Sequence, residues 1–75
     1  MAGPTRAQLR AALYATLSEY GEVDANALLA VVRGIYPGAP VDTKVAGEVL
    51  SELVDQGFAE RIESPGPYRF RIRGL

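Results

Sequence analysis

The spacing of the apolar residues changes once along this chain, at Gly57, and this change restricts the folds that the chain can adopt. Before Gly57 apolar residues recur every three or four positions, the period of an amphipathic helix. After it they alternate with charged residues, the period of a half-buried strand. A chain of 75 residues supports one core, because it buries only ~60% of its unfolded surface. We therefore expect one α+β domain, residues 1–75.

Three helix starts can be recognised from their capping residues. Thr5 and Gln8 have the spacing of a capping box, and Asp24 and Asp42 each follow a valine in the N-cap position. Glycines or a proline-rich turn supply the stops. The pattern predicts helices over residues 5–20, 24–35 and 42–56. The positions expected on their core sides are Leu9, Leu13, Thr16, Leu17 and Tyr20; Leu28, Leu29, Val31, Val32 and Ile35; and Val45, Val49, Leu50, Leu53 and Val54.

The end of the chain predicts a β-hairpin with strands over residues 58–63 and 68–73, joined by a loop with the sequence Pro-Gly-Pro. Both apolar sets, which include Phe58 in the first strand and Phe70 in the second, must face the core. Opposing residue numbers should then sum to an even value. This register places every hairpin arginine on one face. Its pairs are Ser64 with Tyr68, Ile62 with Phe70, Glu60 with Ile72, Glu63 with Arg69, and Arg61 with Arg71.

The composition excludes several classes of function. The chain contains no cysteine and no histidine, which rules out disulfides, thiolate or imidazole metal sites, and Cys-His or Ser-His nucleophiles. No paired carboxylates or phosphate-binding glycine loop occur, so we expect neither an enzyme nor a bound metal or cofactor. No stretch approaches the ~20 apolar residues of a membrane span. Residues 1–6 also lack the apolar run of a secretory signal, and we therefore expect a cytoplasmic protein.

A motif at the end of the third predicted helix carries a family resemblance. Leu50, Leu53, Gly57 and Phe58 form the pattern Leu-x-x-Leu-x-x-x-Gly-aromatic, and a charged strand and a Tyr-x-Phe-x-Ile strand follow. The motif and the order of elements resemble the winged-helix superfamily of DNA-binding domains. The resemblance implies a helix-turn-helix core followed by a hairpin wing. Ferric-uptake-type and MarR-like regulators are loosely similar, but this chain lacks the histidines and cysteines of the former and the long flanking helices of the latter.

The resemblance implies a small transcription regulator that binds double-stranded DNA, with its third helix at the major groove and its wing on the backbone. Charge is divided unevenly between these two elements. Residues 42–56 carry one lysine against four carboxylates, a net charge of −3, whereas the hairpin carries four arginines against two glutamates. Attraction to phosphates must therefore come from the wing. The residues nominated for DNA are Thr43, Lys44, Gly47, Glu48 and Ser51 in the helix, and Arg61, Arg69, Arg71 and Arg73 in the wing.

Less specific explanations exist for the same residues. Glu48 and Lys44 are also ordinary solvent-facing helix residues, and charged strands protect sheet edges from aggregation. A second class of function therefore stays open, a winged-helix module that binds a protein through its third or first helix. The small residues of the first helix also suggest a homodimer, although alanine is common in helices for its propensity alone. The residues of this face are Ala7, Ala11, Tyr14, Ala15 and Ser18.

Overall fold

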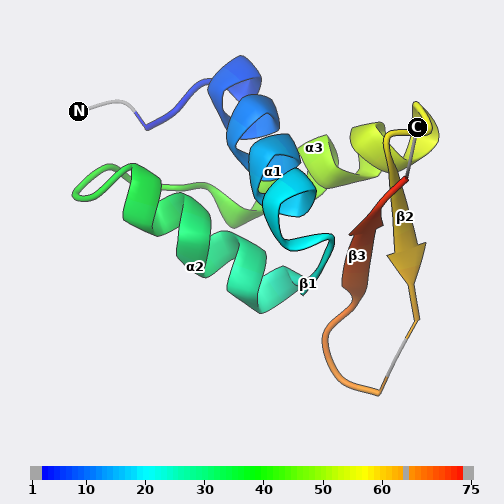
Figure 1. Cartoon of the computed structure of the whole chain (residues 1–75). Helices are drawn as coiled ribbons and strands as arrows, with labels where there is room; N and C mark the ends of the chain where they lie inside the picture. The colour runs from blue at the N-terminus through cyan, green and yellow to red at the C-terminus, as the bar shows by residue number, and fades with distance from the viewer. Residues whose placement is uncertain (1–2, 64, 74–75) are drawn as a thin grey trace.

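The computed structural model describes residues 3–63 and 65–73. Its elements follow the order α1 (Arg6–Tyr20), β1 (Glu22–Asp24), α2 (Ala25–Ile35), α3 (Thr43–Asp55), β2 (Ala59–Ile62) and β3 (Arg69–Ile72) (Figure 1). The strands form one antiparallel sheet in the order β1-β3-β2. Figure 1 shows the β2–β3 hairpin beside the helices, with its loop extending away from them. The predicted α+β class is confirmed.

The helices begin at the capping residues that the sequence indicates. The Gln8 amide donates to Thr5 Oγ1 at 3.1 Å, and the Thr5 amide donates to Gln8 Oε1 at 2.8 Å, which completes the capping box. Asp24 accepts from the Ala27 amide at 2.8 Å, and Asp42 accepts from two amides in the first turn of α3. The predicted helix ranges consequently differ from the observed ones by at most one residue at either end.

Replacing Asp24 with alanine is expected to lower the free energy of unfolding by about 1 kcal/mol, because the first turn of α2 loses its cap. The matched control is Asp55→Ala, at the last residue of α3, where a carboxylate interacts unfavourably with the helix dipole. We expect no loss of stability there. Urea unfolding of both variants measures the difference, and equal losses would contradict a capping role for Asp24.

The sequence predicts a two-stranded hairpin, and the structure adds a third strand, β1. This segment of three residues is too short to show a period. It pairs with β3, with Val23 opposite Phe70, and both of these side chains are buried. Asp24 is at once the last residue of β1 and the cap of α2. The strand therefore joins the hairpin to the helical part of the fold.

The predicted hairpin register is wrong by one residue. The residue numbers of each observed pair sum to an odd value, so Glu60, Arg61, Ile62 and Glu63 do not have their predicted partners. The predicted pair of Ser64 with Tyr68 lies outside the described residues. The observed pairs are Ala59 with Ile72, Glu60 with Arg71, Arg61 with Phe70, and Ile62 with Arg69.

The physical reason for the different register is the burial of a small residue. Ala59 is only 1% exposed, whereas Phe58 is 43% exposed and Tyr68 is 49% exposed. The prediction assumed that the larger apolar residues occupy the core side of each strand. Since successive strand residues face opposite sides, the burial of Ala59 moves its neighbours to the other side.

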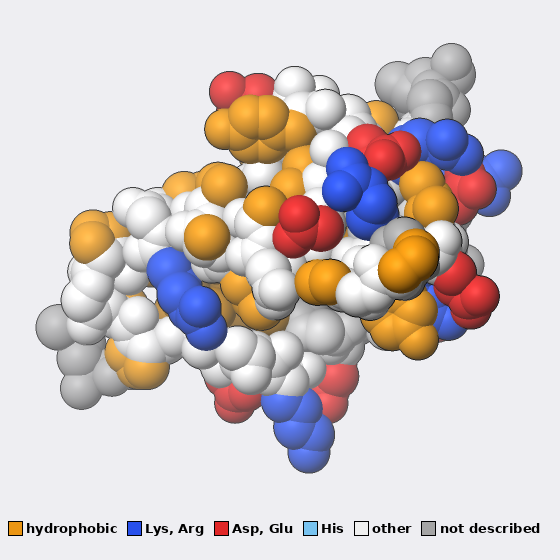
Figure 2. Space-filling view, turned by 90° about the horizontal axis from the view of Figure 1, so that it is seen from below, with side chains coloured by type: hydrophobic (Ala, Val, Ile, Leu, Met, Phe, Trp, Pro, Cys, Tyr) orange, Lys and Arg blue, Asp and Glu red, His pale blue; other side chains and the backbone are white. Residues whose placement is uncertain are grey.

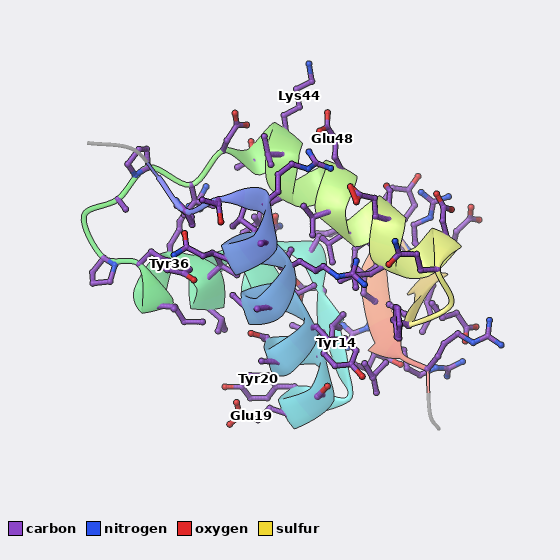
Figure 3. The ribbon with its side chains drawn as sticks, turned by 90° about the horizontal axis from the view of Figure 1, so that it is seen from above. Tyr14, Glu19, Tyr20, Tyr36, Lys44 and Glu48 are labelled. Atoms are coloured by element: carbon purple, nitrogen blue, oxygen red, sulfur yellow. The ribbon has the colours of Figure 1, made fainter. Side chains whose placement is uncertain are left out.

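The core lies where the helices meet. Its largest fully buried side chains are leucines and valines, while two residues of the predicted core sides, Tyr20 and Ile35, are 59% and 48% exposed. Tyr20 is the last residue of α1, and Ile35 is the last residue of α2. Figure 3 shows Tyr20 beside Glu19 at the end of α1 farthest from α3. Within residues 3–63 and 65–73, no helix has the length and apolar character needed to cross a membrane. The fully buried set is Leu9, Leu13, Leu17, Leu28, Val32, Val49 and Leu53.

Candidate functional site

A groove of about 360 Å³ lies between α3, the hairpin and the start of α2. Its walls are mostly apolar, with hydroxyl groups and two charged side chains among them. From α2 come Ala25 and Leu29, and from the hairpin come Arg61, Tyr68 and Phe70. From α3 come Thr43, Gly47, Leu50, Ser51, Val54 and Asp55.

The helical period explains why these α3 residues share the groove. Thr43, Gly47, Leu50 and Val54 follow one another at steps of three or four, so they lie along one side of the helix. Gly47 stands at the middle of this side. A Cβ atom at Gly47 would meet nothing within 4 Å, so the glycine does not relieve a close contact. Its effect is to leave the centre of the groove open.

The observed register brings one arginine of the hairpin to the groove. Arg61 lies opposite Phe70 in the sheet, and both line the groove. The Arg61 guanidinium carbon is 4.9 Å from the centroid of the Tyr68 ring, a cation–π contact. This contact keeps the Arg61 charge at the hairpin wall of the groove.

The other two strand arginines face away from Arg61, so the predicted single arginine face is wrong. Arg69 Nε lies 2.8 Å from Glu22 Oε2, and Arg71 Nη2 lies 3.0 Å from Glu60 Oε2. The hydrogen bond with Glu60 raises the pKa of Arg71 above its ordinary value. A slip of one residue exchanges the two faces of a strand, which explains the difference.

The acidic character of α3 is partly neutralised by α1. Arg6 forms ion pairs with Glu48, at 2.8 Å, and with Glu52. Its hydrogen bonds, first to Glu48 and then to Glu52, raise the pKa of Arg6. The sequence did not indicate these pairs, because Arg6 precedes Glu48 by 42 positions and Glu52 by 46 positions in the chain. Two of the four carboxylates in residues 42–56 therefore already have a basic partner.

The structure brings together some of the residues nominated for DNA and separates others. Thr43, Ser51 and Arg61 line the groove, together with Gly47. Lys44 and Glu48 extend from α3 into solvent outside it (Figure 3). Figure 2 shows one face of the molecule, on which acidic, basic and hydrophobic side chains are interspersed. The described residues on that face form no broad basic surface. Arg73 is exposed just beyond β3.

Most of the groove residues that the sequence missed are apolar, and Asp55 is the charged exception. Leu29 and Val54 were expected in the core, and they are instead half-buried in the groove wall. Periodicity identifies the apolar side of a helix, but it does not tell which residues of that side are buried in the core and which line a groove. One signal was available. Gly47 interrupts an otherwise regular helix at a cost of about 1 kcal/mol relative to alanine.

The predicted dimer face of α1 contains a second hollow, of about 340 Å³. Tyr14, the expected anchor, is half-buried and makes an edge-to-face contact with Phe58 at 5.9 Å between ring centroids. The guanidinium carbon of Arg10 lies over the Phe58 ring, 5.4 Å from its centroid. Tyr14 is thus held within its own chain, and the homodimer stays a prediction. The remaining residues of the face, Ala7, Ala11, Ala15 and Ser18, are exposed.

The polar side chains of the described residues are satisfied in the core, and the groove combines apolar surface with a few polar groups. Every buried side-chain nitrogen and oxygen among them has a hydrogen-bond partner, including Thr16, whose hydroxyl donates to the Ala12 carbonyl at 2.8 Å. No cluster of acidic side chains suited to a metal ion occurs in the described part of the chain. The groove offers apolar surface, three hydroxyls, one cation and one carboxylate. These groups can position a ligand through burial and polar contacts.

Comparisons with protein-family models, with curated proteins and with solved structures find no match to this chain. The class of protein is therefore inferred from the fold and the groove.

Proposed function

We propose that this chain is a winged-helix domain that acts as a protein-interaction module and binds a linear segment of its partner in the groove. The element order α1-β1-α2-α3-β2-β3, with β3 between the other two strands, supports the winged-helix class. In this interpretation α3 is the recognition helix and the β2–β3 hairpin is the wing. The observation that supports a protein as the partner is the mostly apolar wall of the groove.

Electrostatics favour a protein over DNA as the partner. Phosphate contacts supply essentially all non-specific affinity for DNA. Two of the wing arginines, Arg69 and Arg71, already have glutamate partners. On α3 the single lysine, Lys44, stands against three carboxylates, those of Glu48, Glu52 and Asp55. A duplex would therefore find few cations for its phosphates.

DNA binding by a small transcription regulator is the second candidate, and one observation favours it. Thr43 and Ser51 of α3 share the groove with Arg61 of the wing. The two hydroxyls can contact base edges, and the guanidinium can contact a phosphate. For either function we propose the cytoplasm as the compartment, since a chain without cysteine needs no oxidising environment.

The purified protein is expected to show no measurable binding to mixed-sequence duplex DNA at about 50 mM salt, where phosphate contacts are strong. Fluorescence anisotropy with a labelled duplex measures this. Binding that weakens steeply towards about 200 mM salt, and that Arg61→Ala reduces, would overturn the protein-interaction proposal and support the regulator.

A random peptide library selected against the folded domain supplies the positive test. Gly47→Trp places a large side chain in the open centre of the groove, and we expect it to abolish binding of the selected peptides. The matched control is Gly34→Trp. Gly34 is also an exposed helical glycine whose Cβ would meet nothing within 4 Å, but it lies outside the groove. Peptides that bind both variants equally would place the docking site elsewhere.

A further inference from the structure

The two charged side chains that line the groove have no ion-pair partner among the described residues. Asp55 and Arg61 both line it, and neither takes part in any of the ion pairs found in residues 3–63 and 65–73. The residues that do form ion pairs all lie outside the groove lining. They are Arg6, Glu22, Glu48, Glu52, Glu60, Arg69 and Arg71.

The geometry of Arg61 suits it to hold a carboxylate. Its guanidinium lies over the Tyr68 ring, with 4.9 Å between the guanidinium carbon and the ring centroid. Such a contact occupies one face of the planar group and leaves the N–H donors at its edge available. Those donors form a fork that matches a carboxylate in bidentate geometry. Because both residues are exposed, a carboxylate can reach the fork from solvent.

Apolar surface lies directly beside this cation. Phe70 is the cross-strand partner of Arg61, and Leu50 and Val54 face the same groove from α3. The volume of about 360 Å³ is near the lower end of the ~300–1,000 Å³ range of sites that hold drug-sized ligands. A groove of this size accommodates the anchor of a short peptide segment better than a broad protein surface.

We infer that the groove recognises a partner segment in which a large apolar side chain stands next to a carboxylate. The inference rests on the proposed function. The apolar side chain packs against Leu50, Val54 and Phe70, and the carboxylate pairs with Arg61. Asp55 lines the groove from α3 and repels a carboxylate on that side, so the segment is accepted with its acidic group towards the hairpin.

Two blocked peptides, Gly-Glu-Phe-Gly-Gly and Gly-Gln-Phe-Gly-Gly, test this inference by NMR titration of the amide signals of Leu50, Val54 and Phe70. We expect the glutamate peptide to bind about 1.5- to fivefold more tightly, the range for an exposed charge pair. The variant Arg61→Glu is expected to reverse the preference. Arg33→Glu, which changes an exposed arginine of α2 outside the groove, is expected to leave it unchanged.

The outcomes separate this inference from the proposed function. If both peptides bind equally, or if Arg61→Glu leaves the preference unchanged, the inference is overturned and docking in the groove stands. The inference is also overturned, and docking in the groove also stands, if neither peptide shifts these signals while library-selected peptides do shift them. If no peptide from either source binds in the groove, the inference and the proposed function both fail. Signal dispersion in each variant spectrum verifies that the protein is folded.

Discussion

Replacement of Leu17 by alanine is expected to lower the free energy of unfolding by about 3 kcal/mol. Leu17 is fully buried in the cluster formed by all three helices, and truncating a buried leucine removes apolar contacts and leaves a cavity. A chain of 75 residues has a total stability on the order of 4–11 kcal/mol. The substitution therefore removes a large share of it. Urea unfolding followed by circular dichroism measures the change.

The matched comparison is Tyr20→Ala, three residues further along α1. The sequence pattern places both residues on the core side, whereas Tyr20 is 59% exposed in the structure. We expect a change within about 0.5 kcal/mol, the usual range for surface substitutions. A loss at Tyr20 as large as that at Leu17 would contradict the observed exposure of Tyr20 and support its predicted place on the core side.

The substitution Ala59→Asp is expected to cost about 3 kcal/mol or more, because it buries a carboxylate without a partner. Ala59 is 1% exposed in β2 and belongs to the hydrophobic core. The observed register of the hairpin requires this burial. Urea unfolding and the dispersion of the NMR spectrum report the loss of stability and of ordered packing.

Phe58→Asp, one position earlier, is the control. Phe58 is 43% exposed, and its loss removes the ring contacts with Tyr14 and Arg10, at a cost of about 1 kcal/mol. In the even-numbered register predicted from the sequence, Phe58 would be buried and Ala59 would face outward. A greater loss from Phe58→Asp than from Ala59→Asp would therefore support that register.

The register also bears on the proposed function. In the observed pairing Arg71 lies opposite Glu60, and Arg61 lies opposite Phe70 at the groove. In the predicted pairing all the hairpin arginines would share one face, and that face would attract phosphates more strongly. The result with Ala59→Asp therefore also tests the electrostatic reason for preferring a protein partner.

The candidate site was predictable only in part. Thr43, Ser51 and Arg61 could be named in advance, because the resemblance to winged-helix domains assigns roles to the third helix and the hairpin. The groove itself could not. It forms where α2, α3 and the hairpin approach one another, and its apolar wall is made of residues whose pattern is the same as that of core residues.

The sequence by itself determined the helices and their starting points. Capping hydrogen bonds such as those of Thr5, Asp24 and Asp42 join residues two or three positions apart, and the 3.6-residue period follows from backbone geometry alone. Only the tertiary structure decided the third strand, the hairpin register and the charge at the groove. These depend on contacts between segments far apart in the chain, such as Arg6 with Glu48, and no local pattern encodes which distant surfaces meet.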